Sequence, residues 1–365
     1  MQRNTFTVSL SSYNNFLIAV LDGRTAIEIV GYGGSSRDVV IPAEMNNMPV
    51  VAIGNNVFFN KNLTSVSMPD RLSGASIQGS IVYIGRSAFS FNKLTSVLIP
   101  SGVTHIGCEA FSGNQLTSVT IPNSVTHIGE YAFYHNHLIS VSIPNGITHI
   151  ADRAFHQNQL TSVSIPSGVT HIGEEAFYEN HLTSVTIPDG VTHIGKKAFS
   201  YNRLTSVSIP DSVTYIGKRA FYHNQLTSVS IPSGITHIGE EVFSKNQLTS
   251  ISIPDSVIHI GRAAFSENQL TSVSIPSSVT HIGGSAFSKN QLTSVSIPVG
   301  VTYIGFWAFA GNRLTSVSIQ DGVTHIGNFA FYENQLTSVS IPGSVTHLGD
   351  LAFDPGVTIT RGMQR

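Results

Sequence analysis

Apolar residues recur along this chain at a fixed step of 22 positions. The segment Leu204–Gln225 reads LTSVSIPDSVTYIGKRAFYHNQ and shows the pattern. The same step carries phenylalanine from Phe89 to Phe353 and asparagine from Asn92 to Asn334. Such self-similarity is typical of a repeat architecture in which each unit forms one coil. We therefore predict a repeat solenoid of 22-residue coils.

Each coil is predicted to be mostly β, with short strands joined by turn or 3-10 segments. Val207 and Ile209 alternate with serines, so they point inward from one short strand, and Pro210 ends that strand because it cannot donate to a ladder. Gly217 is expected to adopt a turn conformation that other residues avoid. Asn224 is expected to satisfy backbone groups at a tight bend through its amide. A single coil cannot bury its apolar face alone, so the coils must stack into a curved or rod-like array.

The repeat also predicts the organisation of the chain. Residues 36–353 are expected to form the solenoid of about 14 coils, with an insertion at 70–80. Residues 1–35 are predicted to form an N-terminal β-hairpin cap, and residues 354–365 a C-terminal cap or tail. Caps are needed because the open ends of a stack expose strand edges.

The repeat unit LxxVxIPxxVxxIGxxAFxxN resembles the leucine-rich repeats of the BspA-like, or Treponema pallidum, type, whose unit reads LxxLxLPxxLxxIGxxAFxxC. The resemblance covers residues 36–353. The unit departs from that family in its length of 22 rather than 23 residues and in the asparagine that replaces the final cysteine. The resemblance implies a leucine-rich repeat fold. It also implies a bacterial cell-surface or secreted protein that binds host or bacterial surface ligands.

Composition excludes several functions. The chain has 19 basic and 21 acidic residues and a net charge of −2, which argues against binding driven by nucleic-acid or membrane charge. It contains one cysteine, Cys108, interpreted as an inert thiol, and no catalytic motif. No apolar run spans a membrane, and the early run Phe16–Leu21 is too short for a signal peptide. We predict that the chain is not an enzyme, that it needs no cofactor or metal, and that it neither inserts into membranes nor binds nucleic acid.

A column of histidines is predicted on the outside of the coils. At the position of the repeat that corresponds to Tyr215, most units have histidine and the others have tyrosine. Adjacent coils would place these rings about 5 Å apart. Two interpretations are open, a structural stack of flat amphipathic rings or a metal site, and zinc needs more ligands than two neighbours supply. In either case we expect protonation below about pH 6 to make the column repel itself.

Two further surfaces are candidate ligand sites. The first is the outward face of the strands, a hydroxyl array represented by Ser206, Ser208, Ser228 and Ser230. This array could bind carbohydrate or protein on a concave face, or it could order water and bind ice. Alternatively, it only keeps the sheet soluble. The second is an aromatic patch near the C-terminus, which is either a ligand site or a contact with a cap or a further domain; its residues are Tyr303, Phe306, Trp307, Phe329 and Tyr332.

The function expected from these features is that of a non-enzymatic binding solenoid. It would act as a bacterial cell-surface or secreted adhesin, or as an interaction protein, with a protein or carbohydrate ligand. The alternative is an intracellular scaffold for protein–protein contacts. We expect a monomer or weak self-association.

Overall fold

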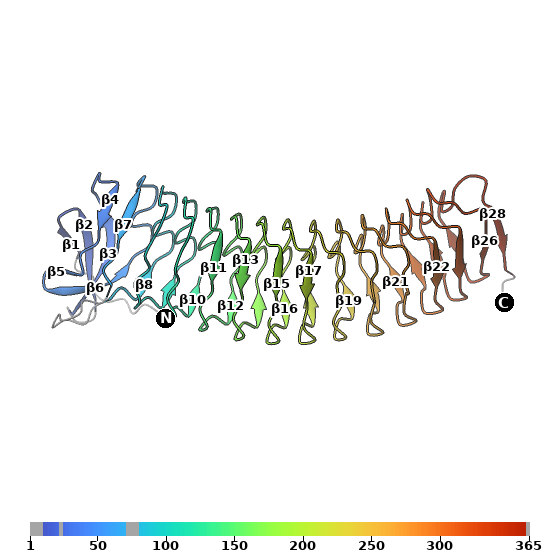
Figure 1. Cartoon of the computed structure of the whole chain (residues 1–365), viewed down its shortest axis with the longest axis horizontal. Helices are drawn as coiled ribbons and strands as arrows, with labels where there is room; N and C mark the ends of the chain where they lie inside the picture. Colours follow the sequence, from blue (N-terminus) through green and yellow to red (C-terminus); the bar gives the residue numbers. More distant parts are fainter. Residues whose placement is uncertain (1–9, 22–24, 71–79, 363–365) are drawn as a thin grey trace. The chain divides into compact units, whose positions relative to one another are not determined.

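The computed structural model describes residues 10–21, 25–70 and 80–362. Its contacts divide the chain into two compact units, which are described separately. Unit 1 comprises residues 1–169 and 179–181, and unit 2 comprises residues 170–178 and 182–365. Within the described residues every regular element is a β-strand, and turns connect the strands. The predicted fold class, a mostly β solenoid of 22-residue coils, is confirmed (Figure 1).

Unit 1 begins with antiparallel strands and continues as coils. β2 pairs with β1 and β3, β3 pairs in parallel with β6, and β5 folds back on β6. The parallel ladder then runs through β6, β8, β9 and β10. Most of the insertion predicted at 70–80, and the ends of both terminal segments, lie outside the described residues. The strands are β1 (Leu10–Tyr13), β2 (Phe16–Leu21), β3 (Ala26–Tyr32), β4 (Asp38–Val40), β5 (Glu44–Met45), β6 (Met48–Ile53), β7 (Ser65–Ser67), β8 (Tyr83–Ile84), β9 (His105–Ile106), β10 (His127–Ile128), β11 (Ser140–Ser142), β12 (His149–Ile150) and β13 (Ser162–Ser164).

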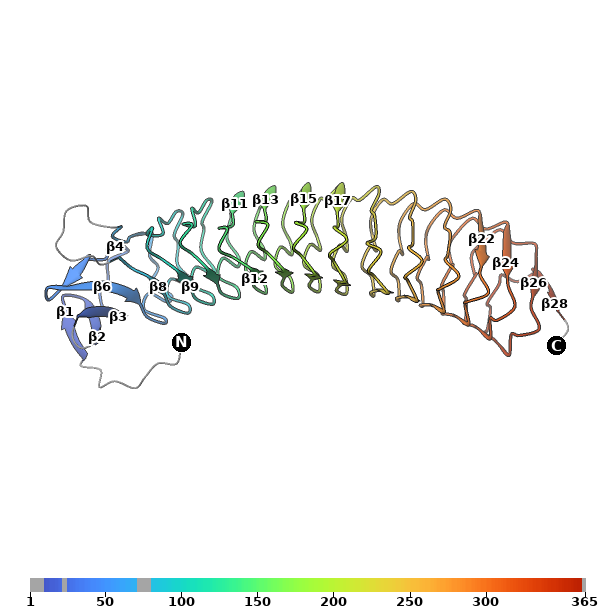
Figure 2. The ribbon, with the colours of Figure 1, turned by 90° about the horizontal axis from the view of Figure 1, so that it is seen from below.

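Unit 2 carries two rows of short parallel strands. One row contains the Ser-Val-Ser segments and the other the His-Ile or Tyr-Ile segments, and both pair with a register of 22 residues. Figure 2 shows β15, β17, β22, β24 and β26 along one side of the coils. The strands are β14 (His171–Ile172), β15 (Ser184–Thr186), β16 (His193–Ile194), β17 (Ser206–Ser208), β18 (Tyr215–Ile216), β19 (His237–Ile238), β20 (His259–Ile260), β21 (His281–Ile282), β22 (Ser294–Ile297), β23 (Tyr303–Ile304), β24 (Ser316–Ile319), β25 (His325–Ile326), β26 (Ser338–Ile341), β27 (His347–Leu348) and β28 (Thr358–Arg361).

A column of phenylalanine rings fills the centre of each unit. In unit 2 the rings from Phe177 to Phe353 are stacked with centroids 5.2–5.8 Å apart and planes within 14° of parallel. Unit 1 has the same column from Phe58 to Phe155. Each ring packs against the same ring of the next coil, so the core extends only by adding coils. Among the described residues, no helix is long and apolar enough to cross a membrane.

Two residues in every regular coil adopt the left-handed backbone conformation. In the coil Leu204–Gln225 they are Arg219, with φ of 59°, and His223, with φ of 55°. The amide of each donates to a carbonyl of the following coil, at 2.9 Å and 3.0 Å. We call the set of residues related by multiples of 22 a slot. The Arg219 slot is thus left-handed although it holds nine residue types between positions 87 and 351, none of them glycine or asparagine.

Gly217 does not adopt the special turn conformation that the sequence predicts, so that prediction is wrong. Its φ lies outside the left-handed region, where other glycines such as Gly311 are found. What excludes a side chain is proximity, because a Cβ at Gly217 would lie 2.6 Å from the backbone nitrogen of Lys196 in the preceding coil. Glycine in this slot therefore permits close stacking of backbones rather than a special turn.

The asparagine prediction is confirmed, and the contacts of Asn224 join two neighbouring coils. Nδ2 of Asn224 donates to the carbonyls of Phe199 (2.9 Å) and Phe221 (3.2 Å), and its Oδ1 accepts from the amide of Leu204 at 3.0 Å. Asn224 is 7% exposed. The same contacts recur at Asn246, so each phenylalanine carbonyl accepts from the asparagine of its own coil and from that of the next. The slot thus satisfies buried backbone groups at the bend of each coil.

The ladder of His-Ile strands is interrupted where a larger residue enters a tight slot. In unit 1, the described β10 and β12 are successive strands of this row but belong to different sheets, and Ala151 takes the place of the glycine beside β12. In unit 2, the described β18 and β19 likewise belong to different sheets, and Val242 takes the place of Ala220 in the coil of β19. A methyl group in place of a hydrogen at Ala151, and a larger side chain in place of alanine at Val242, thus each coincide with a break in strand pairing, as expected for close-packed coils.

Candidate binding surface

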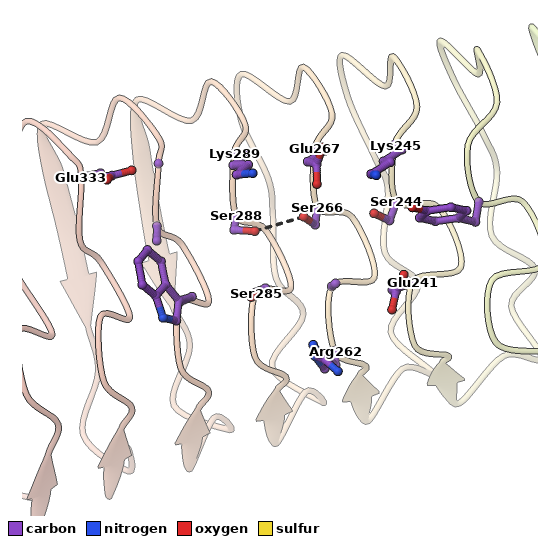
Figure 3. Close-up of a pocket in the computed structure, with 15 residues that line it drawn as sticks. Glu241, Ser244, Lys245, Arg262, Ser266, Glu267, Ser285, Ser288, Lys289 and Glu333 are labelled. Atoms are coloured by element: carbon purple, nitrogen blue, oxygen red, sulfur yellow. Dashed lines mark hydrogen bonds between the residues drawn. The ribbon is translucent and has the colours of Figure 1, made fainter.

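The lateral face of each coil is formed by the Arg219, Tyr222 and His223 slots. These residues flank the alanine–phenylalanine pair, whose phenylalanine is buried. In the coil of Arg219, Tyr222 and His223, the three side chains are partly or fully exposed. Two of the three are left-handed in every regular coil. The three slots therefore form parallel rows of side chains along unit 2 (Figure 3).

Charge pairs cover the first part of this face in unit 2. Arg219 makes two 2.8 Å bonds to Glu241 in the next coil, and Lys197 makes one of 2.8 Å to Glu175. The hydrogen bonds that Arg219 donates to Glu241 raise the pKa of Arg219, and the hydrogen bond that Lys218 donates to Glu240 lowers the pKa of Glu240. These pairs neutralise each other across coils, as the alternating Glu and Lys pairs of the sequence suggest, but exposed pairs contribute little stability.

The lateral face then opens into a groove of about 340 Å³. Its floor consists of small residues in slots that hold large side chains elsewhere. Tyrosine in the Tyr222 slot gives way to Ser244, Ser266 and Ser288, and these serines are buried. The hydroxyls of Ser266 and Ser288 lie 3.1 Å apart (Figure 3). Tyr222 lines one end of the groove and Trp307 the other.

An aromatic cluster forms the Trp307 end of the groove. The ring of Trp307 stacks on Phe329 with centroids 4.8 Å apart, and Tyr332 meets both rings edge-on at 6.0 Å and 5.6 Å. Trp307 is 37% exposed despite these contacts. Three of the five predicted aromatic residues are therefore brought together, which we call the aromatic cluster.

The other two predicted aromatic residues lie elsewhere. Tyr303 belongs to the histidine column, between His281 and His325 at 5.8 Å and 6.0 Å. Phe306 is exposed and lies over Gly284, where a Cβ would approach its ring to 2.6 Å. Nearness in sequence did not predict nearness in space, because neighbouring residues of a coil face different sides.

The predicted serines lie on the strand side of the coils and not in the groove. Ser206 and Ser208 are exposed on β17, paired with β15, and Ser230 bridges to Ser252. Ser228 is exposed beside them. A separate hollow of about 840 Å³ on this side is lined by Ser318, Ser340 and neighbouring residues, so the four predicted serines are outside it. The hydroxyl array remains a candidate ligand surface.

Sequence reasoning missed the serine floor of the groove. The signal is present in the repeat alignment as a run of small residues in the Tyr222 slot, with serine at 244, 266 and 288 and alanine at 310, between tyrosine at 222 and 332. It was overlooked because serine is common in every coil. A run of small residues matters here only because the same slot is bulky on either side.

The histidine column forms as predicted, with rings stacked between coils. In unit 2, His171 and His193 are 4.6 Å apart, as are His259 and His281. A threonine hydroxyl contacts Nδ1 of the following histidine in several coils, for example at 2.8 Å for His193. Among the described residues, no group of three or more His, Cys, Asp or Glu side chains could hold a metal ion.

Acid is expected to destabilise the column. Burial, and after it the charges of His281 and His237, lower the pKa of His259 below its ordinary value of 6.5, and His127 is lowered by burial and by His105. As pH falls through 6.5, these histidines bind protons in the unfolded chain before they do so in the folded chain. Stability that is present above this pH is therefore lost below it. We predict a lower melting temperature at pH 5 than at pH 7.5.

A pair of reciprocal variants checks this expectation. His259→Tyr should reduce the loss of melting temperature between pH 7.5 and 5, since tyrosine occupies this slot naturally at Tyr215. Tyr215→His adds a histidine beside His193, 5.8 Å from the present tyrosine ring, and should increase the loss. Thermal unfolding at both pH values measures the effect. Equal pH dependence in all three proteins would show that the column does not sense protons.

Comparison with known proteins agrees with this geometry. The model for a BspA type leucine rich repeat region matches residues 51–183, 170–290 and 236–360 in six copies. The chain belongs to the BspA-type leucine-rich repeat family. Its 22-residue coils and its asparagine slot are therefore variations within this family. No curated protein sequence matches the chain.

Solved structures of bacterial proteins share the architecture. A leucine rich cell surface protein from Faecalibacterium prausnitzii is 28% identical with a TM-score of 0.62, covering 98% of this chain and 95% of that one. A leucine-rich repeat protein from Bacteroides ovatus is 22% identical with a TM-score of 0.58, over 99% and 100% of the two chains. The pneumococcal vaccine antigen PcpA is 16% identical with a TM-score of 0.56, over 97% and 98%. The last two show the fold alone.

Leucine-rich repeat proteins are generally non-enzymatic binding scaffolds, and they typically bind proteins. BspA-type members are often surface proteins.

Proposed function

We propose that this BspA-type protein is a cell-surface or secreted binding solenoid that recognises a protein or glycan on host or bacterial surfaces. The aromatic cluster carries the proposal. Trp307, Phe329 and Tyr332 form a rigid, partly exposed platform at the end of a groove. Tryptophan and tyrosine are the side chains most often found at the energetic centre of interfaces. The 28% identity to a cell surface protein over 98% of the chain supports the location.

We predict that Trp307→Ala weakens ligand binding by about tenfold without unfolding the coil, because truncating one anchor of a binding site removes roughly 1–2 kcal/mol. The measurement is equilibrium binding of the purified chain to immobilised extracellular-matrix proteins and to a glycan array. The matched control is Phe91→Ala, which removes an aromatic ring that is 53% exposed in unit 1.

The controls separate site, function and location. Unchanged binding in Trp307→Ala would remove the aromatic cluster from the proposal, and absence of any bound probe would overturn the binding function. Protease treatment of intact cells that express the protein tests location. A surface protein is digested, whereas resistance until lysis would favour the intracellular scaffold.

A further inference from the structure

We propose that the groove between Tyr222 and Trp307 binds a neutral, linear oligosaccharide. This inference rests on the proposed binding function and names the chemical class of its ligand. The first observation is the shape of the groove. Serines floor three successive coils in a slot that holds tyrosine at Tyr222 and Tyr332. The hollow therefore arises from replacement of bulky side chains across several coils and spans four coil steps from Tyr222 to Trp307, or about 20 Å.

The backbone of the groove is already used within the solenoid. The amides of Lys245, Glu267 and Lys289 donate to carbonyls of the next coil at 3.0, 3.0 and 2.8 Å. The amides of Ala263 and Ser285 do the same, both at 2.8 Å. An extended peptide that adds to a sheet edge needs unpaired backbone groups, and these amides do not offer them. Recognition in the groove must therefore be made by side chains.

The side chains of the groove balance each other in charge. Lys245, Arg262 and Lys289 supply three positive groups, and Glu241, Glu267 and Glu333 supply three negative groups. A lining with no net charge gives no advantage to a charged ligand. It offers donors and acceptors in alternation, which suits sugar hydroxyls because each of them both donates and accepts.

Aromatic side chains lie at the two ends of the groove, and the face offered to a ligand is that of Trp307, because the cations of Arg219 and Lys245 already lie over the ring of Tyr222. Trp307 is held in place by Phe329 and Tyr332, and Tyr222 by cation–π contacts with Arg219 and Lys245 at 5.4 Å each. The electron-rich face of such a ring attracts the weakly positive C–H groups on the flat side of a sugar ring. An aromatic platform at Trp307 beside a hydroxyl floor thus matches a short chain of sugar rings better than an apolar side chain, which would need a closed pocket.

The chain carries its own reporter for this test, because Trp307 is its single tryptophan. We would titrate the full chain with neutral tetrasaccharides of β-1,4-glucose, β-1,4-N-acetylglucosamine, α-1,4-glucose and α-1,6-mannose, and with tetragalacturonate as the charged comparison. Saturable change in tryptophan emission with at least one neutral probe, and weaker change with the charged probe, is expected. Absence of response to every neutral probe would overturn the proposal, as would tighter binding of tetragalacturonate.

A groove-filling variant assigns the response to the groove. Ser266→Tyr places in the floor of the groove a side chain that the same slot already accommodates at Tyr222. It should weaken binding of the neutral probe at least tenfold and leave the melting temperature unchanged. Ser112→Tyr makes the same change in unit 1, away from the groove, and should leave binding unchanged. Equal binding by both variants would show that the sugar sits elsewhere.

A cell-adhesion assay distinguishes this inference from the broader function. If the chain adheres to cells through Trp307 but adhesion is lost when the cells are treated with protease and is not inhibited by the neutral probes, the ligand is a protein. The binding function would then stand and the oligosaccharide would be rejected.

Discussion

Replacing Asn224 by alanine is expected to lower the free energy of unfolding by about 3 kcal/mol. The side chain is 7% exposed and bonds to backbone groups of Leu204, Phe199 and Phe221. Its loss leaves the buried amide of Leu204 without its 3.0 Å partner and removes one of two amide donors from each phenylalanine carbonyl. A buried group left unsatisfied costs about 1–3 kcal/mol, and the cavity adds to that.

Two variants test the cause. Gln225→Ala removes an exposed neighbour and should change stability by less than about 0.5 kcal/mol. Asn224→Asp keeps an oxygen for Leu204 but turns the other oxygen toward the two carbonyls, so it should destabilise at least as much as alanine at neutral pH. Denaturant unfolding measures the energies, and amide exchange shows whether residues 199–226 open first. If Asn224→Asp were as stable as the natural protein, the Nδ2 bonds would not matter.

Much of the fold could be predicted because the same residue types recur at the same positions of every coil. The inward phenylalanine and the asparagine at the bend each recur at one step, so local roles assigned in a single coil apply to all of them. The asparagine role followed from side-chain chemistry alone, and the structure adds that the side chain joins two neighbouring coils. The histidine column followed from the same repetition.

Features that depend on contact between coils were not predictable in the same way. The need for Gly217 comes from the backbone of Lys196, which is 21 residues earlier in the chain. Tyr303 was grouped with Trp307 by sequence, yet it stacks with histidines. The groove depends on which slots are small in three successive coils, so only an arrangement of the repeat in space shows that Ser266 and Ser288 share a floor.

Replacing Gly217 by alanine is expected to destabilise unit 2 by about 2–4 kcal/mol and to open the pairing of β16 with β18. The added Cβ would lie 2.6 Å from the nitrogen of Lys196 and 2.8 Å from the carbonyl carbon of Gly195, and backbone atoms cannot move aside as a flexible side chain can. Relief requires separation of the coils, which would break the 2.8 Å bond from the amide of Gly217 to the carbonyl of Ile194. Denaturant unfolding and amide exchange at Gly217 and Tyr215 measure both effects.

Gly234→Ala is the matched control, because the nearest atom to its added Cβ is 3.7 Å away and belongs to the side chain of Thr214. It should change stability by less than about 0.5 kcal/mol. The chain already contains the outcome expected for Gly217→Ala, since Ala151 occupies the same slot and the described strands β10 and β12 beside it belong to different sheets. The reverse change, Ala151→Gly, should therefore slow amide exchange at position 151, because the amide of Gly217 in the same slot donates to Ile194 of the preceding coil. If Gly217→Ala kept full protection at Tyr215 and Ala151→Gly altered nothing, close approach of the coils would not be the reason for glycine in this slot.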